Sequence, residues 1–285
     1  MKKLDKLCID IYDNKIIVEI EIENIEINFE KYYNINNNFD QTKITNYVYV
    51  NEKDNSTVVI FTNLINKQFY IDIKEKESLQ IEIEIFDCIN QIIRIALSDD
   101  FYFLHASMVE KNNYGYVVIG KTHSGKSTTA INLLKYGYNY VTDDIVGINK
   151  KNGKVIGINK PIYIRNPNLV STDNNEIKKV YFNNDLYNYL YSNINTQLLN
   201  LNKNLIILKR EKFEDEKYFE VNNINGAKKI LDLIANTFNE DITEQIIIDF
   251  NRLFKNLNLI SFAYHDNIDV AKIIIEKDLF NYEET

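Results

Sequence analysis

Gly120-Lys121-Thr122-His123-Ser124-Gly125-Lys126-Ser127 is the stretch that decides the fold. Its spacing is glycine, four residues, glycine, lysine and serine, which is the complete pattern of a phosphate-binding loop. The apolar run Tyr116–Ile119 precedes it, and apolar residues at helical spacing follow it within 130–134. The segment therefore predicts a buried strand, a tight loop and the start of a helix.

Each residue type in this loop has a physical role. The glycines let the backbone N–H groups point inward at phosphate oxygens, and the helix that follows directs its positive N-terminal end at the same charge. We expect Lys126 to reach the β- and γ-phosphates of ATP, and the Ser127 hydroxyl to coordinate Mg²⁺. A glycine-rich turn without a ligand is the alternative. The predicted nucleotide-binding residues are Gly120, Lys121, Thr122, His123, Ser124, Gly125, Lys126, Ser127 and Thr128.

An acidic pair, Asp143-Asp144, comes one helix and one short strand after the loop. This spacing predicts that both carboxylates lie at the carboxyl end of the adjacent strand, where ligands bind in α/β sheets. One carboxylate can hold Mg²⁺ and the other can accept the proton of an attacking hydroxyl group. The alternative is a solvated turn.

Two further side chains are candidates for the same site. His105 lies on the strand before the loop strand and reaches the acidic pair if the two strands are neighbours; the alternative is a core histidine. Arg165 follows a strand-like run and is a candidate for a phosphate or substrate contact, or a solvated surface residue.

Composition limits the other classes of function. The net charge of −8 and the pI of about 5.1 argue against a nucleic-acid backbone or an anionic membrane as partner. No apolar run approaches the roughly 18–20 residues of a membrane span, so a cytoplasmic protein is expected. Cys8 and Cys88 lie among apolar residues and are expected to be buried thiols.

Glycine placement separates the parts of the chain. Of eight glycines, seven lie between Gly115 and Gly157, so the chemistry is expected in the middle of the chain. Residues 1–98 predict a β-rich domain that ends in a helix over Ile85–Leu97, and residues 99–285 predict an α/β domain. The helices expected in the last third are Asp185–Leu198, Ala227–Phe238, Ile242–Phe254 and Asp269–Phe280.

Four segments together resemble the core of the HPr kinase/phosphorylase family, whose fold is similar to that of phosphoenolpyruvate carboxykinase. They are 105–109 (His-Ala-Ser-Met-Val), 116–127, 135–138 and 141–144. The resemblance implies an α/β P-loop kinase domain of the HPr kinase C-terminal type, with an N-terminal β-rich domain. It also implies that Asp143 is the base, that Asp144 is its partner near the metal and the phosphates, and that His105 contacts the acid.

The chain departs from this family in two places. The downstream glycine-rich signature with the glutamate ligand of Mg²⁺ is not found, which puts phosphorylase activity in doubt; Glu176 is a candidate for that glutamate. The N-terminal region is more similar to that of HPr-kinase-like proteins found beside peptide-modification genes, some of which phosphorylate a serine in a peptide.

The expected function is an ATP- and Mg²⁺-dependent kinase that acts on a serine or threonine hydroxyl of a peptide or protein. The N-terminal strands are expected to recognise this substrate by strand addition. A kinase for free serine and a nucleotide-dependent binding protein without transfer activity are the alternatives. A carboxykinase-like enzyme would need a transition-metal ligand set that the sequence lacks. The sequence is compatible with a homo-oligomer.

Overall fold

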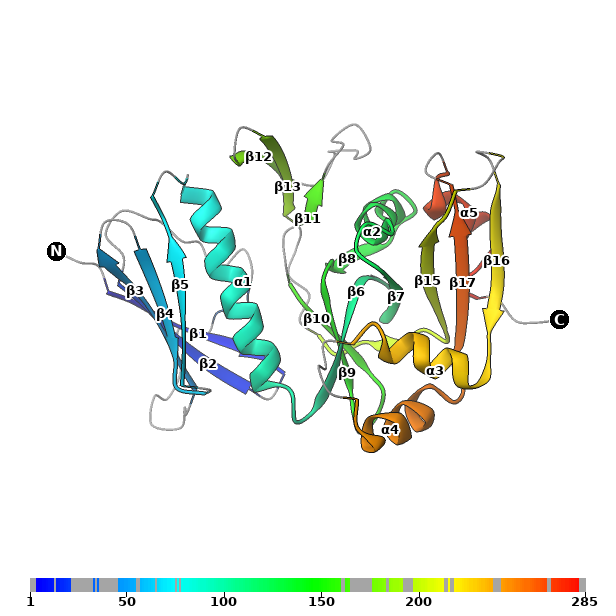
Figure 1. Cartoon of the computed structure of the whole chain (residues 1–285), viewed down its shortest axis with the longest axis horizontal. Helices are drawn as coiled ribbons and strands as arrows, with labels where there is room; N and C mark the ends of the chain where they lie inside the picture. Colours follow the sequence, from blue (N-terminus) through cyan, green and yellow to red (C-terminus); the bar gives the residue numbers. More distant parts are fainter. Residues whose placement is uncertain are drawn as a thin grey trace. The chain divides into compact units, whose positions relative to one another are not determined.

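In the computed structural model the chain forms two compact units (Figure 1). Unit 1 comprises Met1–Asp99, Asn159–Arg165 and Asn175–Thr196, and unit 2 comprises Asp100–Ile158, Asn166–Asn174 and Gln197–Thr285. The structure describes residues 4–12, 14–21, 33, 35, 46–54, 57–64, 66–74, 76, 78–159, 162–164, 176–182, 185–191, 197–212, 215, 218–237, 242–265 and 268–281.

Unit 1 contains a five-stranded sheet and one long helix. The strands follow the order β1-β2-β3-β4-β5, and all neighbours are antiparallel except β2 and β3. The bounds are β1 Leu4–Ile11, β2 Asn14–Glu21, β3 Asn46–Asp54, β4 Thr57–Thr62, β5 Lys67–Asp72 and α1 Ser78–Ala96. The helix contacts β4 and β5 through a buried stripe at helical spacing, which includes Ile85, Ile89 and Ile92. It begins before the expected Ile85.

A second, three-stranded sheet in unit 1 corrects the sequence prediction. The strands β11 (Ile162–Ile164), β12 (Glu176–Phe182) and β13 (Asp185–Tyr191) pair antiparallel in the order β11-β13-β12. The predicted helix over Asp185–Leu198 is therefore wrong. Tyrosines at every second position of residues 187–191 have the period and the composition of a strand, and β12 pairs with β13 along its whole length.

Unit 2 is built on a nine-stranded mixed sheet. Its main path is β10-β9-β6-β7-β15-β17-β16, with β8 beside β6 and β14 beside β7. The strands β7, β15 and β17 are parallel neighbours. The bounds are β6 Phe101–Lys111, β7 Tyr114–Gly120, β8 Asn139–Thr142, β9 Ile145–Asn149, β10 Val155–Ile158, β14 Asn200–Leu201, β15 Asn204–Arg210, β16 Phe219–Ile224 and β17 Asn258–Tyr264.

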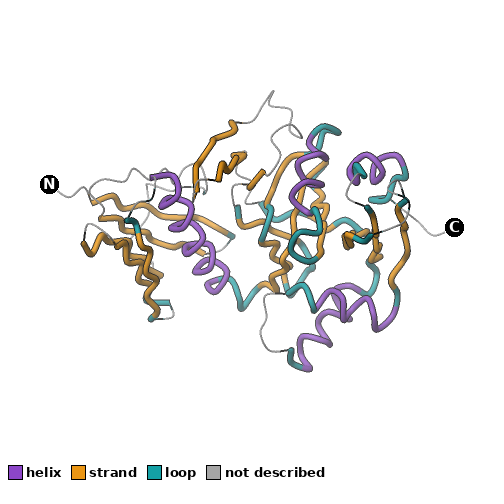
Figure 2. Tube along the Cα trace, turned by 45° about the horizontal axis from the view of Figure 1, so that its top comes forward, coloured by secondary structure: helices purple, strands orange, loops and turns teal. Residues whose placement is uncertain are grey.

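Helices cover both faces of this sheet. The helices α2 (Lys126–Leu134) and α5 (Val270–Glu276) share one buried cluster with Val118 of β7. The helices α3 (Gly226–Ile234) and α4 (Glu244–Phe254) share another with the next residue, Ile119, and lie together in Figure 2. Because successive residues of a strand point to opposite faces, the continuous apolar run of β7 is that of a strand buried on both sides.

The expected mixed α/β architecture with a β-rich N-terminal region is confirmed. The helix after the glycine loop begins at Lys126, and Gly137, in the turn after this helix, has the left-handed φ of 79°. Helix α3 begins one residue before its predicted range, α4 and α5 lie within theirs, and all three are shorter than predicted. Cys8 is a buried free thiol and Cys88 is a partly buried one. No helix in the described ranges has the length and apolar character needed to cross a membrane.

Candidate functional site

The phosphate-loop sequence and the acidic pair lie at the same edge of the unit 2 sheet. Both β7 and β8 pair antiparallel with β6, so their carboxyl ends lie on the same side. The loop leaves β7 after Gly120, and Asp143 follows the last residue of β8. Residues 105–107 of β6 lie beside both ends. Sheet topology therefore brings together the segments that the sequence singled out.

The backbone of the loop is held in a tight curl before the helix begins. Gly125 caps α2 with a φ of 89°, in the left-handed region that favours glycine. Its carbonyl oxygen accepts the first helical bond, from the Thr129 N–H at 2.9 Å. His123 also has a left-handed φ, of 67°, which is uncommon for a residue with a side chain. The loop thus stores local backbone strain immediately before the helix.

Lys126 is buried inside this loop. Its ammonium group donates to the Gly120 carbonyl at 2.9 Å and to the Lys121 carbonyl at 3.3 Å, and the residue is 6% exposed. Burial lowers the pKa of Lys126, and the charges of Asp143 and Asp144 act in the opposite direction. The cation is therefore held within the loop, where bound phosphate oxygens would be stronger partners than neutral carbonyls.

Two hydroxyl groups contact the carboxylate of Asp143. Ser107 Oγ donates to its Oδ1 at 2.6 Å, and the Ser127 side chain is also hydrogen-bonded to it. The pKa of Asp143 is raised to about 6, chiefly by burial and also by the charge of Asp144, while the hydrogen bonds from the two serines and the charge of Lys126 act in the opposite direction. A carboxyl group that titrates near neutral pH is suited to accept a proton.

Asp144 has a different partner. Its Oδ1 lies 2.9 Å from His105 Nε2, and both side chains are about one-third exposed. The Asp144 carbonyl oxygen accepts from the N–H of Ala106 at 3.2 Å, which ties the acidic turn to β6. His105 therefore reaches the pair, as its position on the neighbouring strand predicted, and it does so at Asp144.

Ser127 and the acidic pair supply oxygen ligands at this edge of the sheet. The Ser127 hydroxyl and the carboxylates of Asp143 and Asp144 are hard ligands of the kind that Mg²⁺ takes together with phosphate oxygens. In the described part of the chain, no group of three or more histidine, cysteine or acidic residues forms a protein-only metal site. This donor set fits Mg²⁺ that is bound jointly by protein and nucleotide.

Two predicted residues are not part of the described site. Arg165 lies outside the described residues, so its phosphate or substrate contact stays a prediction. Glu176 begins β12 in unit 1, and its side chain is outside the described part of the structure.

Sequence reasoning missed two residues that contact the site. Ser107 lies two positions after His105 on β6, and this spacing on one strand could have found it. Tyr264 donates its hydroxyl to the Ser124 carbonyl across 140 positions of sequence, and no local pattern indicates this contact.

The fold and the site define an α/β protein with a Walker A sequence followed by an acidic pair. No family model matches the chain. A 61-residue stretch is 38% identical to an HPr kinase/phosphorylase of Clostridium botulinum, covering 21% of this chain and 20% of that protein. A 69-residue stretch is 35% identical to an HPr kinase/phosphorylase of Malacoplasma penetrans, covering 24% and 23%.

The match spans about a fifth of the length of these curated relatives. A solved structure, the Hpr(Ser) kinase/phosphatase from Coxiella burnetii, aligns with 63% of this chain and 88% of its own at 14% identity, with a TM-score of 0.30. A TM-score of 0.30 is too low for a conclusion about a shared fold. The resemblance to HPr kinase/phosphorylases is thus confirmed for one segment of the chain.

Proposed function

We propose that this protein is a kinase that transfers the γ-phosphoryl group of ATP to a serine or threonine hydroxyl of a peptide or protein. The observation that carries the proposal is the environment of Asp143. Its carboxyl group has a pKa raised to about 6 and is hydrogen-bonded to Ser127 of the glycine loop. The segment similarity to HPr kinase/phosphorylases supports the same class of reaction.

The proposed chemistry uses the loop for charge and the acidic pair for the proton. The loop N–H groups and Lys126 would hold the phosphates, and Ser127 with Asp144 would bind Mg²⁺, which neutralises the charge that develops on the transferred group. Asp143 would orient the acceptor hydroxyl and take its proton as the oxygen–phosphorus bond forms. His105 would hold Asp144 in position through the contact between His105 Nε2 and Asp144 Oδ1.

The proposal also includes a cellular location and a class of substrate. We place the enzyme in the cytoplasm, with a peptide of the kind made by peptide-modification systems as substrate. Nucleic acids and membranes are not proposed as partners, because the net charge is −8. Assembly into a homo-oligomer is a further proposal, which sedimentation of the purified protein tests.

Unit 1 is the proposed site of peptide recognition. Its strand β5 is at one edge of the five-stranded sheet, and no other described strand pairs with its outer side. An extended peptide can add to such an edge through main-chain hydrogen bonds.

One labelling experiment tests the proposal. The purified protein receives ATP labelled at the γ-phosphate, Mg²⁺, and one of three additions: a serine-bearing peptide library, free L-serine, or no acceptor. Label in a peptide supports the proposal, and label in free serine replaces it with a small-molecule kinase. If ATP binds and label stays on the nucleotide with every acceptor, a nucleotide-dependent binding protein is the better reading.

A further inference from the structure

Tyr264 links the C-terminal strand of unit 2 to the glycine loop. It is the last residue of β17, which pairs parallel with β15, and β15 pairs parallel with the loop strand β7. Its hydroxyl group donates to the Ser124 carbonyl oxygen at 2.7 Å, and the residue is only 3% exposed. A buried hydrogen bond therefore joins the loop to a strand two positions away in the sheet.

The same hydroxyl group fills the space beside the second glycine of the loop. A Cβ atom added at Gly125 would lie 2.1 Å from Tyr264 Oη, far inside van der Waals contact. Gly125 also has the left-handed φ of 89°. A side chain at position 125 is thus excluded both by the backbone and by the tyrosine that packs against it.

This contact also determines the direction of one N–H group of the loop. In a trans peptide the carbonyl of one residue and the N–H of the next point in opposite directions. With the Ser124 carbonyl held on Tyr264, the Gly125 N–H is directed away from the tyrosine. A carbonyl rotated to the other side would present a negative dipole to the phosphates.

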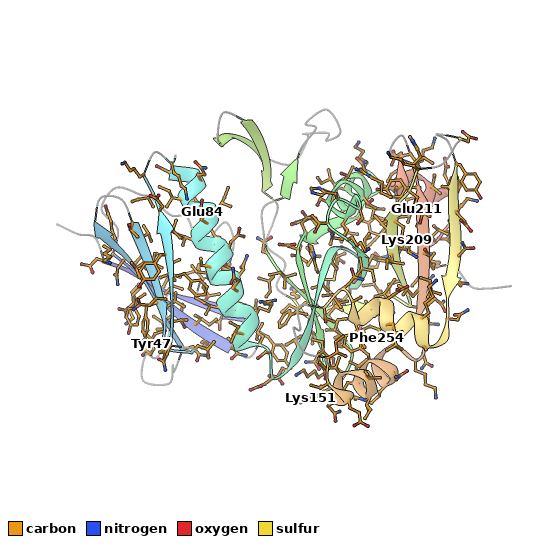
Figure 3. All side chains as sticks on the ribbon, in the orientation of Figure 1. Tyr47, Glu84, Lys151, Lys209, Glu211 and Phe254 are labelled. Atoms are coloured by element: carbon orange, nitrogen blue, oxygen red, sulfur yellow. The ribbon has the colours of Figure 1, made fainter. Side chains whose placement is uncertain are left out.

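Contacts to its backbone and to its ring hold the tyrosine in place. Its backbone oxygen accepts from the Glu211 N–H at 3.0 Å; Glu211, labelled in Figure 3, follows the last residue of β15. Its ring packs edge-on against Phe262, with 5.9 Å between ring centroids. A rigidly held donor of this kind can keep a loop in one arrangement before the ligand arrives.

We propose that Tyr264 is a positioning residue that presets the Ser124–Gly125 peptide of the loop for binding a triphosphate. The inference rests on the proposed function, because it assumes that the loop binds the phosphates of ATP. It adds a residue outside the loop sequence that acts on binding through the direction of a loop peptide. The tyrosine itself need not touch the nucleotide.

The test measures ATP affinity in the Tyr264→Phe variant by titration calorimetry in the presence of Mg²⁺. The change keeps the ring and removes the donor, so the affinity for ATP is expected to fall about 5- to 30-fold. The matched control is Tyr102→Phe, which removes a hydroxyl bonded to Asp249 of α4 and is expected to leave ATP affinity unchanged. Thermal unfolding without nucleotide is recorded for both variants.

A second variant covers the case in which Tyr264→Phe does not fold. 4-Fluorophenylalanine in place of Tyr264 fills the space beside Gly125 and still cannot donate, so the same loss of affinity is expected. If Tyr102→Phe loses as much ATP affinity as the Tyr264 variants do, the loss is a general effect of destabilisation. That result would overturn the inference.

The Lys126→Ala variant separates failure of this inference from failure of the proposed function. If Lys126→Ala loses ATP affinity and both Tyr264 variants bind as the wild type does, the loop binds phosphate and the positioning role is wrong. If the wild-type protein itself does not bind ATP, the proposed function fails and the inference fails with it.

Discussion

Asp143 and Asp144 are adjacent residues whose carboxylates have different environments. Asp143 accepts from Ser107 and has a pKa raised to about 6, whereas Asp144 pairs with His105 and is about one-third exposed. Two carboxyl groups with separate partners can divide the work of proton transfer and metal binding. The roles assigned to them are therefore testable one residue at a time.

The first residue-scale prediction concerns the Asp143→Asn variant. An amide cannot accept the proton of the acceptor hydroxyl, so the transfer rate is expected to fall on the order of 10²–10⁴-fold. ATP affinity is expected to persist, because the loop and Lys126 are unchanged. Rates come from the labelled-ATP assay and affinities from calorimetry. Equal losses in both would show that Asp143 is a metal ligand or a structural residue, since it also contacts Ser127.

The second residue-scale prediction is a pH profile. Because the base must be ionised, the transfer rate at saturating ATP is expected to rise with pH through a midpoint near the Asp143 pKa of about 6. Ser107 lowers that pKa through its hydrogen bond, so the midpoint in Ser107→Ala should move to higher pH. An unchanged midpoint in this variant would show that a group other than Asp143 titrates.

The same pKa shift has a consequence for folding. Burial raises the pKa of Asp143 from 3.8 to about 6, so the folded state holds this proton more tightly than the unfolded state does. The contribution of Asp143 to stability is therefore greatest below pH 4 and decreases as the pH rises towards 6. At neutral pH the partly buried charge of Asp143 therefore opposes folding.

At the scale of elements, the glycine loop joins β7 to α2 and is shaped by both. The strand delivers the loop to the carboxyl edge of the sheet, and the helix begins at Lys126 with Gly125 as its cap. His123, between the two glycines of the pattern, has a left-handed φ of 67° although it carries a side chain. Such strain persists where surrounding structure holds it in place.

The element-scale prediction follows from this strained residue. In His123→Gly, relief of the left-handed strain exceeds the added entropy of the unfolded chain, so the free energy of unfolding should rise by about 0.5–1 kcal/mol. Denaturant unfolding of the protein without nucleotide measures it. A lower stability for the variant would mean that contacts of the imidazole outweigh the backbone strain.

A matched control lies in the hairpin between β6 and β7. Asn113 has a similar φ of 66°, and Asn113→Gly should also stabilise the protein, without changing ATP affinity. If the imidazole of His123 contacts the phosphates, as its place in the loop predicts, only His123→Gly should lower ATP affinity. Equal affinities in the two variants would remove His123 from the predicted nucleotide-binding residues.

At the scale of the whole molecule, the two units are not consecutive stretches of chain. Unit 1 contains residues 1–99 and also most of residues 159–196. Within unit 2, Val155 pairs with Leu199, so the chain leaves and re-enters this unit at adjacent positions. The residues proposed for phosphate binding and proton transfer, among them Lys126, Ser127 and Asp143, all belong to unit 2. A division of labour between 1–98 and 99–285 stays a proposal.

The whole-molecule prediction uses this connectivity. The variant lacks residues 1–98, and a short glycine-serine linker joins Ile158 to Gln197 in place of residues 159–196. It is expected to retain ATP binding, because the loop, the acidic pair and Tyr264 remain. Its affinity for an acceptor peptide is expected to fall at least tenfold. Calorimetry with ATP and with the peptide measures both. Unchanged peptide affinity would exclude unit 1 from substrate recognition.

The sequence by itself determined the parts of this protein that depend on neighbouring residues. The spacing of the glycine loop, the start of α2 at Lys126 and the turn at Gly137 follow from backbone conformations available to a few residue types. The acidic pair at the end of β8 followed from counting one helix and one strand. These features are local, so a single sequence contains the signal for them.

Only the tertiary structure decided which distant residues complete the site. Ser107 reaches Asp143 because β6 lies between β7 and β8, and Tyr264 reaches Ser124 because β17 lies two strands from the loop. The strand β13 also depends on its partner, because pairing with β12 satisfies hydrogen bonds that an isolated segment could equally satisfy as a helix. Contacts between segments far apart leave no periodic pattern in the chain, which is why sheet order had to be seen.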